Sequence, residues 1–254
     1  MQELRPNEIL SRTDHRPYPV PPGSWALFMS WRDLLFMHWR VDAGALRPLI
    51  PPVLGLDTFD GGAWLGVTPF RMSSVRPRAL PSVPYLSNFP ELNLRTYVTA
   101  EDKPGIWFFS LDAGNRIAVR LARAGFSLPY YDAEMSSRVV GGEVRYRSAR
   151  THRGAKEARF AGRYRPVGEP FESRPGTLEH FLTERYCLYA ADRKGNLYRG
   201  DIHHHPWSLQ RAELALETLA MTQQIGMALP DEEPILHFSR HLDVLAWLPR
   251  RVDA

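Results

Sequence analysis

Residues 91–135 constrain the fold more than any other part of the sequence. They read as a strand, a Pro-Gly turn, an aromatic strand, a short helix, and a turn at Leu128-Pro129 into another strand. Polar and apolar side chains alternate along the segment, as they do in strands whose two faces meet different surroundings. The polar members that could line a pocket are Asn93, Arg95, Tyr97, Asp112, Arg123, Tyr130, Tyr131 and Glu134. The segment therefore predicts a β-rich fold with a polar pocket.

The rest of the chain adds hairpin signals and few helical ones. Turns at Asp60-Gly61-Gly62, at 151–154 and at 193–196 predict three hairpins, and residues 24–41 and 242–248 predict further strands. We expect short helices after Asp42 and over 177–185, and an irregular loop over 71–90. Residues 208–227 predict a strand followed by a helix from about Glu217. No boundary divides the sequence, so we expect a single domain over residues 1–254, with residues 1–24 as a surface arm.

The hairpin around residues 151–154 has one apolar and one basic face. Val144, Tyr146, Phe160 and Tyr164 share one parity, and Arg145, Arg147, Arg159, Arg163 and Arg165 share the other. We interpret the arginines as a solvated outer face that protects an edge, with an anion or nucleic-acid site as the weaker alternative. No nucleic-acid-binding motif accompanies them, so we expect no nucleic-acid partner.

Composition excludes several classes of protein. The N-terminus lacks the apolar core of a signal peptide, and the most hydrophobic window, 25–39, contains Arg32 and Asp33. We therefore expect a cytoplasmic protein with no membrane contact. The single cysteine, Cys187, excludes an intrachain disulfide and reads as a core residue. All three lysines (Lys103, Lys156 and Lys194) lie beside turn signals.

The run His203-His204-His205 raises the question of a metal site. On a strand, His203 and His205 share one face while His204 points to the other, so the run supplies two ligands at most. Catalytic zinc usually has three protein ligands, and Glu184, Asp201 or His180 would have to complete the set. We favour histidines that are hydrogen-bonded near a strand end, and we expect no metal and no cofactor. A metal site stays open as the alternative.

Seven short motifs together resemble the YqjF-like uncharacterised protein family. They are LFMHWRV (35–41), GAWLG (62–66), NLRTYV (93–98), WFFSLDA (107–113), LPYYDAEM (128–135), ERYCLY (184–189) and HHPW (204–207). That family is placed in the acetoacetate-decarboxylase-like superfamily. The resemblance implies a mainly β (α+β) fold, a double-layered antiparallel β barrel with a central cavity and a few peripheral helices, which the hairpin pattern supports independently.

The chain departs from the decarboxylases at their catalytic motif, G-R-E-x-x-G-x-P-K-K. The matching segment here is 122–131, in which Arg123 and Pro129 are kept while Tyr130 and Tyr131 replace both lysines. Glu91 resembles the pocket glutamate of those enzymes. Since a tyrosine hydroxyl cannot form an imine, Schiff-base decarboxylation is disfavoured.

Two hypotheses follow from this reading. In the first, the protein acts without covalent catalysis on a small organic acid or ketone. Its catalytic candidates are Arg123, Tyr130, Tyr131, Glu91 and Glu134, and its ligand-binding candidates are Asn93, Arg95, Tyr97, Tyr146, Arg150, Glu184 and Tyr186. In the second, the same barrel binds a small ligand and performs no chemistry. The sequence leaves open whether the protein forms a homo-oligomer.

Overall fold

The computed structural model describes residues 3–120, 127–192 and 194–252. Its helices are short: α1 (Pro6–Leu10), α2 (Ala43–Leu46), η1 (Arg47–Leu49), α3 (Pro84–Ser87), α5 (Leu178–Thr183) and η2 (Gln223–Ile225). The strands are β1 (Leu27–Val41), β2 (Gly55–Leu56), β3 (Ala63–Pro77), β4 (Phe89–Ala100), β5 (Lys103–Ala113), β6 (Tyr130–Val140), β7 (Glu143–Arg150), β8 (Arg159–Phe171), β9 (Cys187–Ala191), β10 (Leu197–His203), β11 (Leu209–Ala220), β12 (Ile235–Ala246) and β13 (Arg250–Arg251).

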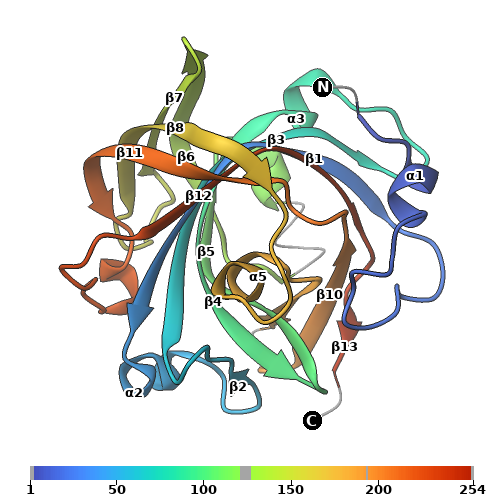
Figure 1. Cartoon of the computed structure of the whole chain (residues 1–254), viewed down its shortest axis with the longest axis horizontal. Coiled ribbons are helices and arrows are strands. Elements are labelled where there is room, and N and C mark those ends of the chain that lie inside the picture. The colour runs from blue at the N-terminus through green and yellow to red at the C-terminus, as the bar shows by residue number, and fades with distance from the viewer. Residues whose placement is uncertain (1–2, 121–126, 193, 253–254) are drawn as a thin grey trace.

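Strand pairing closes the sheet into two rings that share a wall. The larger ring runs β5-β6-β7-β8-β11-β12-β1-β3-β4 and returns to β5, and the smaller ring runs β12-β10-β9-β5-β4-β3-β1 and returns to β12. Strands β12, β1, β3, β4 and β5 belong to both rings (Figure 1). Helix α5 lies across the smaller ring in the same view. The expected mainly β fold with a few peripheral helices is confirmed.

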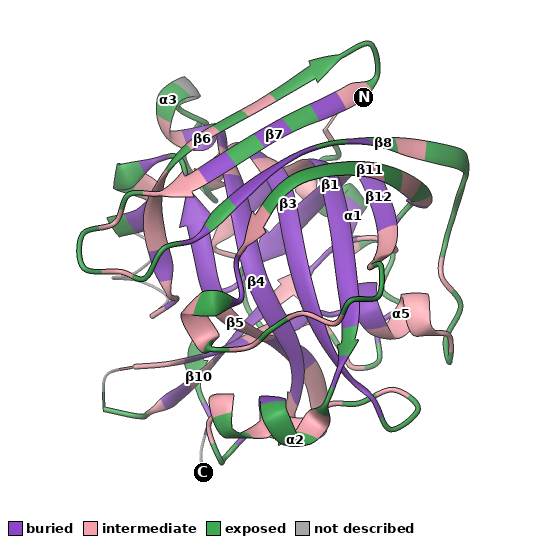
Figure 2. Cartoon of the chain, turned by 90° about the vertical axis from the view of Figure 1, so that its left-hand side faces the viewer, coloured by how far each residue is buried: buried purple, intermediate pink, exposed green. Residues whose placement is uncertain are grey.

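Along the shared wall, successive side chains face the larger and the smaller ring in turn, so that each ring has its own core. On β1, Leu35 and Met37 belong to the hydrophobic cluster of the larger ring, while Leu34 and Phe36 belong to that of the smaller ring. Strands β1, β3 and β4 are accordingly buried along most of their length (Figure 2). A strand buried on both faces reads as a nearly continuous apolar run, which explains the aromatic density of residues 25–41.

Several local predictions are confirmed and others are wrong. The Asp42 carboxylate caps α2 through the amide of Ala45 at 2.7 Å, and the hairpins β7–β8 and β9–β10 form as expected.

Residues 71–77 are not loop but the second half of β3. The predicted helix from Glu217 is strand β11, because its residues pair with β8 up to Ala220. In the first predicted hairpin, β2 pairs with β4 rather than with β3.

The arginine face of β7 and β8 points outward, as predicted. Arg147 and Arg163 reach Glu217 on β11, at 2.8 and 3.7 Å, and Arg165 reaches Glu213 at 2.6 Å. These exposed ion pairs add little to stability individually and keep the strands solvated.

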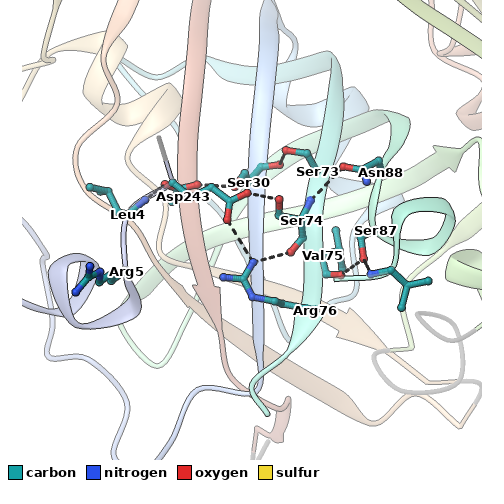
Figure 3. Close-up of polar contacts among 12 residues, drawn as sticks. Leu4, Arg5, Ser30, Ser73, Ser74, Val75, Arg76, Ser87, Asn88 and Asp243 are labelled. Carbon is teal, nitrogen blue, oxygen red and sulfur yellow. Dashed lines mark hydrogen bonds and ion pairs between the residues drawn. The ribbon is translucent and has the colours of Figure 1, made fainter. Parts of the chain in front are cut away.

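Residues 3–24 lie on the outside of the rings and are attached at specific points. The amide of Leu4 donates to Asp243 at 2.7 Å, and Ser30 donates to the same carboxylate at 2.5 Å (Figure 3). Ile9 is completely buried against Phe28 and Leu245. The predicted surface arm is therefore packed onto the sheet by an apolar anchor as well as by polar contacts.

Among the described residues, no helix has the length and apolar character needed to cross a membrane.

Candidate functional site

Strand β4 places a row of polar side chains on the inner face of the smaller ring. Glu91, Asn93, Arg95 and Tyr97 alternate with Leu92, Leu94 and Val98, which face the larger ring. Asn93 pairs across the sheet with Thr68 on β3 and with Leu111 on β5. All four polar residues had been predicted to line a pocket, and strand alternation is what brings them onto one face.

Glu91 is a buried carboxyl group held by Tyr130. The Tyr130 hydroxyl donates to Glu91 Oε2 at 3.0 Å, and only 2% of the Glu91 surface is exposed. Burial raises the pKa of Glu91 to about 8, because desolvation outweighs the hydrogen bond from Tyr130, and the nearby Asp112 charge adds to the rise. Glu91 is therefore mostly protonated at neutral pH. It can donate a proton to an acceptor inside the ring.

Three strands of the shared wall meet at His38, Gly66 and Arg95. Gly66 on β3 pairs with His38 on β1 and with Arg95 on β4. A Cβ atom at position 66 would lie 3.1 Å from His38 Cδ2 and 3.2 Å from Arg95 Cγ. Because Gly66 has no side chain, it leaves room for the side chains of His38 and Arg95 to lie close to each other. The motifs LFMHWRV, GAWLG and NLRTYV, which are distant in sequence, converge at this row.

A chain of hydrogen bonds links this row to α5. Tyr97 Oη lies 2.6 Å from His38 Nε2 and 2.8 Å from the carbonyl oxygen of Leu182. Arg95 Nη2 reaches the same carbonyl at 3.5 Å. The last carbonyls of a helix have no partner within the helix, so Tyr97 and Arg95 satisfy one of them. Burial, with help from the Arg95 charge, holds the pKa of His38 well below its usual value, and its imidazole is neutral.

Arg95 is buried, and the described part of the chain offers it no counter-ion. Its surface is 9% exposed, and no carboxylate of the described residues lies within 4.0 Å of its guanidinium. Its guanidinium carbon lies 5.1 Å from the centre of the Phe36 ring, and its Nε has no hydrogen-bond partner among the described residues. A buried charge is costly unless it is paired. Arg95 is therefore suited to an anion that enters the ring.

Further buried polar atoms around the smaller ring lack a partner in the described part of the chain. They are His38 Nδ1, Thr68 Oγ1, Asn93 Oδ1, His237 Nδ1, Ser239 Oγ, and the indole nitrogens of Trp31, Trp64 and Trp207. Native interiors leave few such atoms unsatisfied, and clusters of them mark sites for water or a ligand. Sequence reasoning missed His38, Thr68 and His237. The sequence does carry a signal for these three residues. Each lies two positions from an apolar residue on a strand that is buried on both faces, so its side chain faces the same interior.

Other predicted site residues face the larger ring. Arg150 forms an ion pair with Asp112 at 2.8 Å, and both side chains are almost fully buried. The Arg150 guanidinium carbon also lies 4.1 Å from the centre of the Tyr131 ring. The Tyr146 hydroxyl donates to the backbone oxygen of Glu91 at 2.7 Å and lies 3.1 Å from that of Phe70. These residues form a group separate from the Glu91–Arg95 row, on the opposite face of the shared wall.

Glu184 and Tyr186 form a third group at the end of the smaller ring. The Tyr186 hydroxyl donates to Glu184 Oε2 at 2.5 Å, and the amide of Trp207 donates to Glu184 Oε1 at 2.9 Å. This contact joins the motifs ERYCLY and HHPW. Burial raises the pKa of Glu184.

The three histidines bind backbone carbonyls. His203 Nε2 lies 2.9 Å from the oxygen of Ile9, and His204 Nδ1 lies 2.7 Å from that of His205. Burial lowers the pKa of His203 to about 4 and that of His204 to about 3. No cluster of three or more His, Cys, Asp or Glu side chains within the described ranges is arranged to hold a metal ion.

Two of the predicted catalytic residues do not belong to any of these groups. Glu134 is exposed on β6, so the prediction that it lines the pocket is wrong: the residues of opposite parity, Tyr131 and Met135, are turned inward. Arg123 lies outside the described residues.

A groove of about 1060 Å³ lies near the ends of β5, β6 and β9. Its described lining includes Trp107, Phe109, Tyr131 and Tyr198, and none of Glu91, Asn93 or Arg95. We place the candidate site in the smaller ring, where Arg95, which has no carboxylate partner among the described residues, and the protonated Glu91 share one face.

Comparisons with known proteins agree with this architecture. The structure of enduracididine biosynthesis enzyme MppR complexed with pyruvate superposes with a TM-score of 0.63 at 14% identity, covering 94% of this chain and 93% of that one. An acetoacetate decarboxylase from Legionella pneumophila gives a TM-score of 0.61 at 12% identity, covering 100% and 98%. The fold is therefore that of the acetoacetate-decarboxylase-like proteins.

Sequence comparison gives the family. A model of the family described as "Uncharacterized conserved protein", domain of unknown function 2071, matches residues 28–243. Uncharacterized protein YqjF of Bacillus subtilis (strain 168) is 47% identical over 243 residues, which is 96% of this chain and 99% of YqjF. The chain belongs to this YqjF-like family.

Proposed function

We propose that the smaller ring binds a small oxo acid or ketone and catalyses proton transfer beside its carbonyl group without forming a covalent intermediate. The observation that carries the proposal is Arg95, a buried guanidinium with no carboxylate within 4.0 Å among the described residues. Arginine binds carboxylates through paired hydrogen bonds, and a ligand carboxylate would remove the cost of leaving this charge unpaired.

Glu91 would supply the proton. It stands four residues from Arg95 on the same face of β4, which separates their Cα atoms by about 13 Å along the strand. A ligand between them would lie over Asn93 and Thr68. A protonated Glu91 donates to the carbonyl oxygen, and the carboxyl group takes a proton from the adjacent carbon. Keto and enol forms then interconvert with no net change in the protein.

The Tyr130 hydroxyl holds the Glu91 carboxyl in place, and its position matches that of the decarboxylases' Schiff-base lysine. Since tyrosine forms no imine, chemistry at this site would rest on proton transfer and electrostatic stabilisation. One neighbour of this fold was crystallised with pyruvate, which agrees with an oxo acid as the class of ligand.

The test combines binding with isotope exchange. Oxo acids of increasing length, from pyruvate to 5-oxohexanoate, are titrated calorimetrically and incubated with the protein in deuterium oxide, and exchange beside the carbonyl is followed by NMR. We expect at least one acid to bind and to exchange faster than in buffer. Arg95→Gln should weaken binding about tenfold or more. Glu91→Gln should abolish exchange while binding persists.

Arg145→Gln, on the exposed outer face of β7, is the matched control and should change neither result. Binding that survives Arg95→Gln undiminished, or exchange that survives Glu91→Gln, would overturn the assignment. Binding without exchange by the unaltered protein would favour the alternative function, a small-ligand binding protein on the same fold.

A further inference from the structure

His38 is a buried group of the smaller ring that the proposed function leaves unused. It is 1% exposed, it lies beside Arg95 across Gly66, and its Nδ1 has no hydrogen-bond partner among the described residues. The ring stacks on Phe36 with 5.8 Å between centroids, and Nε2 is fixed by Tyr97. An imidazole held this firmly presents its other nitrogen in one direction.

The hydrogen bonds around Tyr97 determine which nitrogen of His38 carries the proton. The carbonyl oxygen of Leu182 can only accept, so the Tyr97 hydroxyl donates its proton there, at 2.8 Å. The 2.6 Å contact between Tyr97 Oη and His38 Nε2 is then satisfied only when Nε2 carries the hydrogen. The neutral imidazole keeps one proton, so Nδ1 is left with its lone pair. His38 Nδ1 is therefore a buried acceptor that needs a donor.

The charges nearby decide what kind of donor fits. The positive charge of the Arg95 guanidinium acts on His38, so a ligand ammonium at the same place would be repelled. His237, whose Nδ1 is also without a partner in the described chain, has its pKa lowered by burial and is neutral, so it adds no charge to the site. A neutral hydroxyl meets no such penalty. Asn93 Oδ1, another unpartnered acceptor on the same inner face, favours the same group.

We propose that the ligand of the smaller ring is a hydroxylated carboxylic acid, with its carboxylate on Arg95 and a hydroxyl group donating to His38 Nδ1. This inference rests on the proposed function for the carboxylate anchor and adds a second recognition element to it. His38 is a specificity-determining residue in this arrangement. Tyr97 is a positioning residue that fixes the tautomer.

The experiment measures a preference rather than a single affinity. Butanoate is compared calorimetrically with 2-, 3- and 4-hydroxybutanoate, and 2-oxobutanoate with 4-hydroxy-2-oxobutanoate. In the unaltered protein we expect at least one hydroxylated acid to bind about tenfold more tightly than its counterpart, as one hydrogen bond to a buried acceptor allows. In His38→Phe that ratio should fall to about one, while the affinity for the acid without the hydroxyl is kept.

Tyr97→Phe supplies the second variant, since it frees His38 to change tautomer and should reduce the preference without removing the imidazole. His205→Phe, a histidine outside the ring, should leave the ratio unchanged. Hydroxylated acids that bind no better than their counterparts, or a preference that persists in His38→Phe, overturn this inference and leave the carboxylate anchor standing. If no member of any pair binds although one of the oxo acids from pyruvate to 5-oxohexanoate does, this inference fails and the proposed function stands. If none of those oxo acids binds either, both fail.

Discussion

Tyr130 and Tyr131 are adjacent in sequence and point into different rings. Tyr130 donates its hydroxyl hydrogen bond to Glu91 in the smaller ring, and the Tyr131 ring lies against Arg150 on the side of the larger ring. The two positions that match the lysines of the decarboxylases therefore do not form one catalytic pair in this chain. Tyr130 stabilises the buried side chain of Glu91 directly. Tyr131 stabilises the buried side chain of Asp112 through Arg150, which donates to that carboxylate.

The stability of the protein should depend on the ionisation of Glu91. Its pKa is about 8 when folded and near 4.3 when unfolded, so the folded state binds the proton more tightly. The stabilisation is complete below the unfolded value and is lost as pH rises through the folded value. Between pH 6.5 and 7.5 we expect Glu91 to lower the free energy of unfolding by about 1 kcal/mol per pH unit.

Urea denaturation at several pH values compares the unaltered protein with Glu91→Gln, which mimics the protonated carboxyl. The variant should show the flatter pH dependence. Asp112, whose pKa burial raises to about 6, contributes in the same direction at lower pH and is common to both proteins. Parallel curves for the two proteins over this range would show that Glu91 is ionised at neutral pH.

The pair Asp112–Arg150 should behave as a buried structural ion pair. Both side chains are almost inaccessible, and Arg150 also donates to Gln224 at 2.9 Å. Removing one partner leaves a buried charge unpaired, so Asp112→Asn and Arg150→Met should each destabilise the fold by about 3 kcal/mol. The double variant should lose less than the sum of the two, which a double-mutant cycle by urea denaturation measures. Additive losses would mean that the two groups do not interact.

The fold could be predicted from sequence because its main signals are local. Turn residues, strand alternation and the Asp42 cap act over a few residues, and the structure confirms them. The failures are also physical. Residues 71–77 become strand because β1 and β4, which are distant in sequence, offer them hydrogen bonds, and residues 217–220 become strand because β8 does. No pattern within either segment records those partners.

The candidate site shows the same division between local and distant information. Glu91, Asn93, Arg95 and Tyr97 were predictable, since one strand carries them at alternate positions. His38 was not, because its role depends on Gly66 and Tyr97, which reach it from β3 and β4. The prediction for Glu134 was wrong because the residues on either side of it do not indicate which face of β6 is turned inward.

A substitution at Gly66 distinguishes an effect on the geometry of the site from an effect on the stability of the fold. A methyl group there would meet His38 Cδ2 at 3.1 Å and Arg95 Cγ at 3.2 Å, so Gly66→Ala must push both side chains aside. We expect it to destabilise the fold by about 1–3 kcal/mol and to weaken the binding of carboxylic acids severalfold. Gly200→Ala is the control, since its methyl would meet the flexible end of Leu188 at 3.3 Å and neither His38 nor Arg95. That variant should keep full affinity, as calorimetric titration of both variants would show. If Gly66→Ala binds the acids as well as the unaltered protein, the ligand does not depend on where His38 and Arg95 stand.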